Sequence, residues 1–145
     1  MKRITVETLV GIFMIAGLVC LAYISVKLGD VSLFGTNNYI VKARFANISG
    51  LKEGAEVEIA GVKVGKVSKI SLDNYEARVE LLIHPDVKIQ DDSIASIRTQ
   101  GIIGDKYIKI SPGGSEEYVK PNGQIPETES AIELEELISK YIFEK

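Results

Sequence analysis

The sequence has very few of the side chains that build metal centres and nucleophilic active sites. It contains one cysteine, Cys20, and one histidine, His84, in 145 residues. One thiol cannot form an intramolecular disulfide, so an exported domain of this chain must be stable from packing or assembly alone. Cys20 lies in an apolar run, and His84 precedes Pro85 at a predicted strand end, where a surface turn residue is expected. We therefore predict no catalytic residue and no metal site.

Positive charge is also limited. Lys and Arg together number 17 against 20 Asp and Glu, which gives a formal net charge of -3. Without a basic excess, a nucleic-acid partner is not expected. Residues 61–66 contain two glycines and two lysines, but the glycines are too close together for a phosphate-binding loop. Val67 also replaces the Ser or Thr that would hold magnesium in such a loop. We therefore predict no nucleotide site and no cofactor.

Charged residues are absent from residues 8–26. A helix over this run is long enough to cross a hydrocarbon core of about 30 Å at roughly 1.5 Å per residue. Lys2 and Arg3 precede the run, and cytoplasmic flanks favour Lys and Arg. We predict that residues 1–29 form a cytoplasmic stub and a single-pass inner-membrane anchor. The rest of the chain would then lie in the periplasm.

A cleaved signal peptide is the competing interpretation of this run. Its apolar region would be shorter, about 7–15 residues, and would end at a small-x-small cleavage site. No clean site follows Ser25, and Val19 is bulky where a lipoprotein signal needs a small residue before Cys20. The length of the run therefore favours a retained anchor.

Short segments with period-two alternation of apolar and polar residues follow residue 38. Gly, Asn, Asp and Pro separate them, and no helical pattern lies between them. Six or seven short strands predict an all-β unit over residues 38–114, and a barrel is favoured because closure removes free strand edges. The expected strands centre on Tyr39–Phe45, Val57 and Ile59, Val62 to Val67, Ala77 to Ile83, Ile94–Thr99 and Lys106–Ser111.

The spacing of apolar residues changes from alternation to a helical pattern within residues 115–145, which we interpret as a linker and a C-terminal amphipathic helix. Ser130 and Glu133 have the spacing of a capping box at a helix start. A helix of this length is marginal alone, so its apolar face must pack on something. It either folds back on the barrel or associates with other copies, and the pattern does not decide between these. The apolar face contains Leu134, Leu137, Ile138, Tyr141 and Ile142.

Residues 101–104 carry two large apolar side chains, Ile102 and Ile103, between Gly101 and Gly104. The local pattern favours one continuous strand with an isoleucine in the core. The glycines point instead to a turn, because glycine weakens strand interiors and permits tight turns. Grouped apolar residues at an exposed turn would indicate a binding surface.

Four separated motifs, in order along the chain, resemble the MCE (mammalian cell entry) domain family. The resemblance runs from the anchor to about Gly114 and is specific, because each motif stands in the family's order. The motifs are ETLVGIF at residues 7–13, FANISGLKEGAEV at 45–57, IAGVKVGKV at 59–67 and RTQGIIGDKYI at 98–108.

The resemblance implies a seven-stranded β-barrel and, for family members with one anchor and one such domain, a homohexameric ring. In such rings a loop between the last two strands carries paired apolar residues, often leucines, into a central pore. Ile102 and Ile103 occupy those positions here, with Gly101 and Gly104 as the loop hinges. The C-terminal helices of such rings gather near the axis.

The resemblance further implies a phospholipid transport system of Gram-negative bacteria that helps maintain outer-membrane lipid asymmetry. The expected partners are an ABC permease, an ATPase, a periplasmic lipid-binding carrier and phospholipid. The alternative is a membrane-anchored periplasmic scaffold or adhesion domain without lipid transfer. We do not expect an enzyme, because the sequence offers no plausible base, nucleophile or metal cage.

Overall fold

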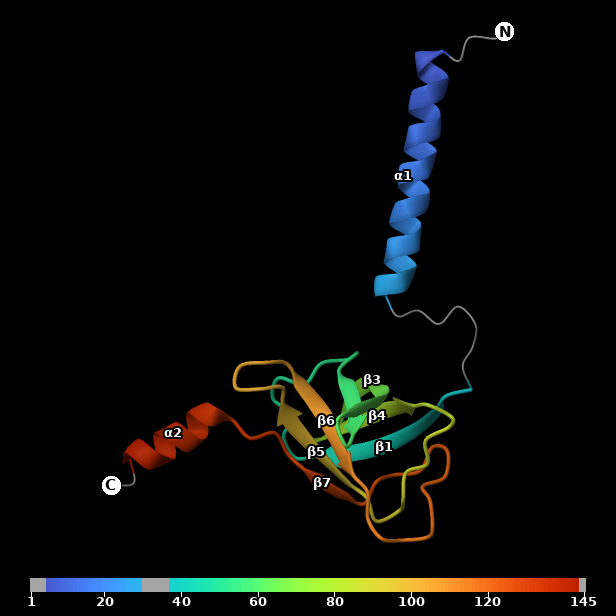
Figure 1. Cartoon of the computed structure of the whole chain (residues 1–145). Helices are drawn as coiled ribbons and strands as arrows, with labels where there is room; N and C mark the ends of the chain where they lie inside the picture. Colours follow the sequence, from blue (N-terminus) through green and yellow to red (C-terminus); the bar gives the residue numbers. More distant parts are fainter. Residues whose placement is uncertain (1–4, 30–36, 144–145) are drawn as a thin grey trace. The chain divides into compact units, whose positions relative to one another are not determined.

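The computed structural model describes residues 5–29 and 37–143 (Figure 1). The chain divides into two compact units, Met1–Gly35 and Thr36–Lys145. In the first unit, α1 (Val6–Leu28) has 23 residues and no buried side chain. Its length, and a mean hydropathy of 2.5 over an 18-residue window, are sufficient to cross a membrane. Lys2 and Arg3, on which the predicted orientation depends, lie outside the described residues.

The second unit contains a seven-stranded sheet that is nearly closed into a barrel, so the predicted fold class is confirmed (Figure 1). The strand order is β1-β4-β3-β2-β6-β5-β7, with a short helix, α2 (Leu134–Phe143), after the last strand. The strands are β1 (Tyr39–Phe45), β2 (Glu56–Ile59), β3 (Val62–Asp73), β4 (Glu76–Ile83), β5 (Ile94–Thr99), β6 (Lys106–Ser111) and β7 (Glu127–Glu129).

The barrel interior is filled by the alternating apolar side chains of the strands. In β1 and β4, the antiparallel register sets Val41 opposite Leu81 and Ala43 opposite Val79. All four side chains are fully buried, whereas the intervening Lys42 is partly exposed. A small barrel packed in this way leaves no channel through its own centre. The other fully buried large side chains include Phe45, Val57, Ile83, Ile97, Ile108 and Ile110.

Two tight hairpin turns join β2 to β3 and β3 to β4. Ala60 and Gly61 have φ of 53° and 81°, and Asn74 and Tyr75 have φ of 52° and 64°. Two consecutive positive φ values define the turn whose twist matches that of the flanking strands. Gly61 therefore belongs to a hairpin turn, and Lys63, Gly65 and Lys66 belong to β3, in agreement with the prediction that these residues form no phosphate-binding loop.

β7 lies within residues 115–145, the range that we assigned to the linker and C-terminal helix. It pairs in parallel with β5, and Gln124 just before it bridges in parallel to Lys42 of β1. Ile125 is fully buried, and the Thr128 hydroxyl donates a hydrogen bond to the Arg44 carbonyl. The β unit thus extends past residue 114. Sequence periodicity missed β7 because three polar residues cannot display an apolar alternation.

The register assigns each connection to one of the two ends of the barrel. The chain enters β1 at the end that also holds the β2–β3 turn, because Tyr39 pairs with Ile83 and Ile59 with Val62. The β3–β4 turn, the β5–β6 turn and the exit from β7 lie at the opposite end (Figure 1). Gly101–Gly104 and residues 130–133 therefore lie at this second end.

Candidate functional site

The turn between β5 and β6 projects two large apolar side chains into solvent. Ile102 is 80% exposed and Ile103 is 95% exposed. The backbone N–H of Gln100 donates to the carbonyl of Asp105 at 3.0 Å, which closes the base of the turn. Gly101 has φ of +70°, a conformation that glycine adopts without steric cost. The interpretation as one continuous strand with a core isoleucine is therefore wrong, because the strands end at Thr99 and resume at Lys106.

A hollow of about 510 Å³ lies against this turn. One wall is apolar and is formed by Ile102, Ile103 and Ile132, a residue from the segment after β7. Two charged residues, Lys106 and Glu133, line the same hollow. The arrangement therefore combines hydrocarbon, one cation and one carboxylate in a space that is open to solvent.

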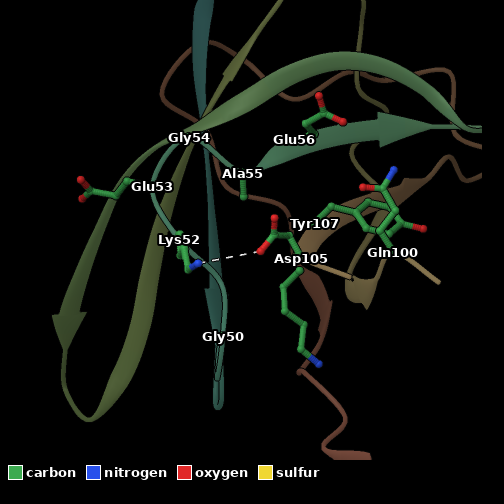
Figure 2. A pocket seen from close by; sticks show the side chains of 10 residues that line it. Gly50, Lys52, Glu53, Gly54, Ala55, Glu56, Gln100, Asp105 and Tyr107 are labelled. Carbon is green, nitrogen blue, oxygen red and sulfur yellow. Dashed lines mark ion pairs between the residues drawn. The ribbon is translucent and has the colours of Figure 1, made fainter. Parts of the chain in front are cut away.

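A second, more polar hollow of about 580 Å³ lies between the β1–β2 connection and the β5–β6 turn (Figure 2). The Lys52 ammonium lies 3.8 Å from the Asp105 carboxylate across it, and both side chains are largely exposed. Gln100 and Tyr107 line the β5–β6 side. An exposed ion pair of this kind contributes at most about 1 kcal/mol, so it fixes the turn only weakly.

Three hydrogen bonds tie the segment after β7 to the barrel. The Asn47 N–H donates to the Ser130 hydroxyl oxygen at 3.2 Å, and the Ala131 N–H donates to the Asn47 carbonyl at 3.0 Å. The Lys106 ammonium donates to the Ile132 carbonyl at 3.0 Å. Residues 130–132 are thereby held beside the β5–β6 turn. Sequence reasoning missed Lys106 and Ile132, because nothing local signals a contact across 26 residues.

α2 begins at Leu134, so the predicted capping box at Ser130 is wrong. The Ser130 hydroxyl accepts a hydrogen bond from Asn47 instead of capping the helix, because the tail first follows the barrel for several residues. The apolar side chains of α2 are exposed in the single chain, and the side chain of Leu134 lies outside the described ones. The exposed residues are Leu137, Ile138, Tyr141, Ile142 and Phe143, at 52–83%.

The described residues offer no group of three or more His, Cys, Asp or Glu side chains that could hold a metal ion. His84 is exposed at the end of β4, and Cys20 is exposed on α1. Cys20 and His84, the members of the one possible Cys–His pair, therefore belong to different units. The second end of the barrel instead has an exposed apolar surface, formed by Ile102, Ile103 and Ile132, with Lys106 and Glu133 beside it.

Comparison with known proteins relates the whole chain to transport proteins. A family model described as "MlaD protein" matches residues 37–113. The Haemophilus influenzae "Intermembrane phospholipid transport system binding protein MlaD" is 36% identical over 149 residues, covering 98% of this chain and 89% of that protein. The Escherichia coli K12 protein of the same name is 36% identical over 146 residues, covering 94% of this chain and 80% of that protein.

Solved structures give the same relationship. A chain of the "Acinetobacter MlaFEDB complex in ATP-bound Vtrans1 conformation" matches with a TM-score of 0.74 and 27% identity. The match covers 96% of this chain and 100% of that chain. The names of these relatives describe transport, in agreement with the prediction that the chain is not an enzyme. With its barrel, its apolar N-terminal helix and this identity over nearly its full length, the chain belongs to the MlaD family of MCE-domain proteins.

Proposed function

We propose that this protein is the membrane-anchored, lipid-contacting subunit of an intermembrane phospholipid transport system. The observation that carries the proposal is the exposed pair Ile102 and Ile103 on a barrel whose interior is packed. The names of the relatives support the same substrate class, since they describe phospholipid transport.

The energetics of acyl chains explain why such a subunit is needed. Exposing each CH₂ group to water costs about 0.8 kcal/mol, so a lipid with two sixteen-carbon tails costs on the order of 25 kcal/mol to expose fully. Transfer between membranes therefore needs a continuous apolar path. The isoleucines give alkyl chains a surface without directional bonds, and this permits release as well as capture.

The path must lie outside the barrel, because side chains such as Leu81 and Ile108 fill its interior. We propose a homo-oligomeric ring, a hexamer by family resemblance, in which symmetry gathers the isoleucine turns into a collar around a pore. Gly101 and Gly104 act as the hinges of each turn. The apolar face of α2 associates with the same face of other copies, which removes its exposed side chains from water.

The chain supplies no energy for directed transport, because its described residues hold no recognisable nucleotide site. We propose that an ABC permease and ATPase supply it, in line with the MlaFEDB complex that the chain resembles. A periplasmic lipid-binding carrier would exchange lipid with the ring. The N-terminus would be cytoplasmic and the barrel periplasmic, at the inner membrane, and the system would help maintain outer-membrane lipid asymmetry.

The test changes Ile102 and Ile103 together to asparagine in the full chain. The chain is reconstituted with its transport partners, and transfer of a fluorescent phospholipid between vesicles is measured. We expect transfer to be abolished while the mass of the assembled particle is unchanged, because both side chains are exposed and do not support the fold.

Leu72 and Tyr75 provide a matched control, since they are 78% and 95% exposed at the neighbouring β3–β4 turn. Changing both to asparagine removes an equally exposed apolar pair and should leave transfer intact. Undiminished transfer in the isoleucine variant would contradict the proposal. The scaffold or adhesion alternative predicts that neither pair affects lipid, and that no lipid accompanies the purified protein.

A further inference from the structure

Lys106 stands out among the lysines near the β5–β6 turn because its charge is not matched. Its side chain is half-buried, and the ammonium donates to the neutral carbonyl of Ile132 at 3.0 Å. Lys52, by contrast, lies within 4 Å of a carboxylate. Among the side chains that the structure describes, which do not include that of Glu135, no carboxylate forms an ion pair with Lys106. An ammonium has three donors, so Lys106 keeps two for an anionic acceptor.

The stem of Lys106 is fixed in place by the backbone beside it. A Cβ on Gly50 would lie 3.2 Å from Lys106 Cγ, so the aliphatic stem packs directly on the glycine. Gly50 has φ of +82°, which favours glycine at this position. The packed stem and the hydrogen bond to Ile132 therefore hold the ammonium at the lining of the 510 Å³ hollow.

The walls of this hollow match the parts of one class of molecule. Ile102, Ile103 and Ile132 offer hydrocarbon, Lys106 offers a cation, and Glu133 offers a carboxylate. A glycerophospholipid has an acyl chain joined to a phosphate, and in a zwitterionic lipid an amine follows that phosphate. Inorganic phosphate would use the cation but would leave the apolar wall unmatched.

We propose that this hollow binds a zwitterionic phospholipid, with the phosphate on the Lys106 ammonium, the amine near Glu133 and an acyl chain along the isoleucines. The inference rests on the proposed lipid-transport function and adds to it a site that selects the headgroup. Charge-assisted hydrogen bonds to phosphate are roughly twice as strong as neutral ones, so Lys106 would dominate the selection.

The test compares two photoreactive probes with the same diazirine-labelled acyl chains, phosphatidylethanolamine and diacylglycerol. Each is incorporated into vesicles that contain the full chain, and covalent labelling is measured. We expect the phosphatidylethanolamine-to-diacylglycerol labelling ratio to fall about fivefold or more in Lys106→Gln, since the charge is lost. Lys106→Arg should keep the ratio. Lys52→Gln is the matched control, because Lys52 lines the neighbouring hollow and not this one.

The possible results test the proposed lipid function and the proposed headgroup site separately. Absence of labelling by either probe in the unmodified protein would contradict the proposed function itself. If labelling is strong and the phosphatidylethanolamine-to-diacylglycerol ratio is the same in Lys106→Gln as in Lys52→Gln, the proposed headgroup site is wrong. The proposed lipid function is then unaffected. If millimolar inorganic phosphate removes the preference for phosphatidylethanolamine over diacylglycerol, the hollow is a free-phosphate site and the lipid assignment is overturned. A Lys106→Arg ratio as low as that of Lys106→Gln would also overturn it, because tethering of Ile132 alone would then explain the loss.

Discussion

Gly104 packs directly against the carbonyl oxygen of Gln100. A Cβ on Gly104 would lie 1.9 Å from that oxygen, which is far closer than two such atoms can approach. The same residue, Gln100, donates its N–H to the Asp105 carbonyl. The shape of the turn that presents Ile102 and Ile103 therefore depends on the absence of a side chain at Gly104.

Gly104→Ala should distort this turn, because the backbone of Gln100 would have to move away from the new methyl group. We expect a loss of about 1–3 kcal/mol in the free energy of unfolding, measured by urea denaturation. Gly114→Ala is the control, since its Cβ would meet nothing within 4 Å, and it should change stability by less than about 0.5 kcal/mol. Equal losses in both variants would contradict the steric explanation.

Ile125→Ala should destabilise the β unit although residue 125 lies beyond the predicted barrel range. The side chain is fully buried, the Ile125 N–H donates to the Lys42 carbonyl of β1, and truncating a buried isoleucine costs about 2–5 kcal/mol. The free energy of unfolding is the measurement. Leu72→Ala, at a residue that is 78% exposed, should cost less than about 0.5 kcal/mol. If the two variants were equally stable, Ile125 could not belong to the core.

Tyr39 should make the free energy of unfolding fall at alkaline pH. Its hydroxyl donates to the Val87 carbonyl at 2.6 Å, and burial raises the pKa of the phenol above its ordinary value of 10.0. As the pH rises past 10.0, the unfolded chain loses this proton before the folded chain does, so stability falls.

Tyr39→Phe should remove this component of the pH dependence and cost about 1 kcal/mol at neutral pH, because the Val87 carbonyl loses its donor. Free energies of unfolding are measured for both proteins about one pH unit below and about one pH unit above the ordinary tyrosine pKa. The unmodified protein should lose more stability between these two pH values than the variant does. Parallel pH profiles for the variant and the unmodified protein would count against the effect of burial.

The apolar face of α2 should hold copies of the chain together. Changing Leu137 and Tyr141 to aspartate places two charges on that face, and native mass spectrometry of the full chain should then give smaller particles. Ser139→Asp is the control, because it adds the same group on a different face of the helix. A particle of unchanged mass in the double variant would support the alternative in which α2 folds back on its own barrel.

The sequence carried enough information for most of the barrel. In β1 and β4 the alternation of Val41, Ala43, Val79 and Leu81 with polar residues is local, and the structure has the same faces buried. β7 could not be found in this way. Its residues are Glu-Thr-Glu, and it is a strand only because β5 lies beside it, with Glu129 accepting hydrogen bonds from Ser96 and Arg98.

The candidate site shows the same division between local and distant causes. The glycines on either side of Ile102 and Ile103 pointed to a turn, but the local pattern alone favoured a strand, because branched apolar residues suit both. The contact between Lys106 and Ile132 depends on how a strand and a tail 26 residues apart meet. The Ser130 capping box failed for a similar reason, since a partner on the barrel took the hydroxyl that would have capped the helix.

The separation of connections between the two ends of the barrel has a consequence for how such proteins diversify. The chain arrives at one rim, and the isoleucine turn and the tail depart from the other. Under the proposed lipid function, substitutions at the departing rim can change which lipid is bound without altering how the chain enters β1. Changes in the length of the chain ahead of β1 leave the β5–β6 turn and the residues that contact it in place.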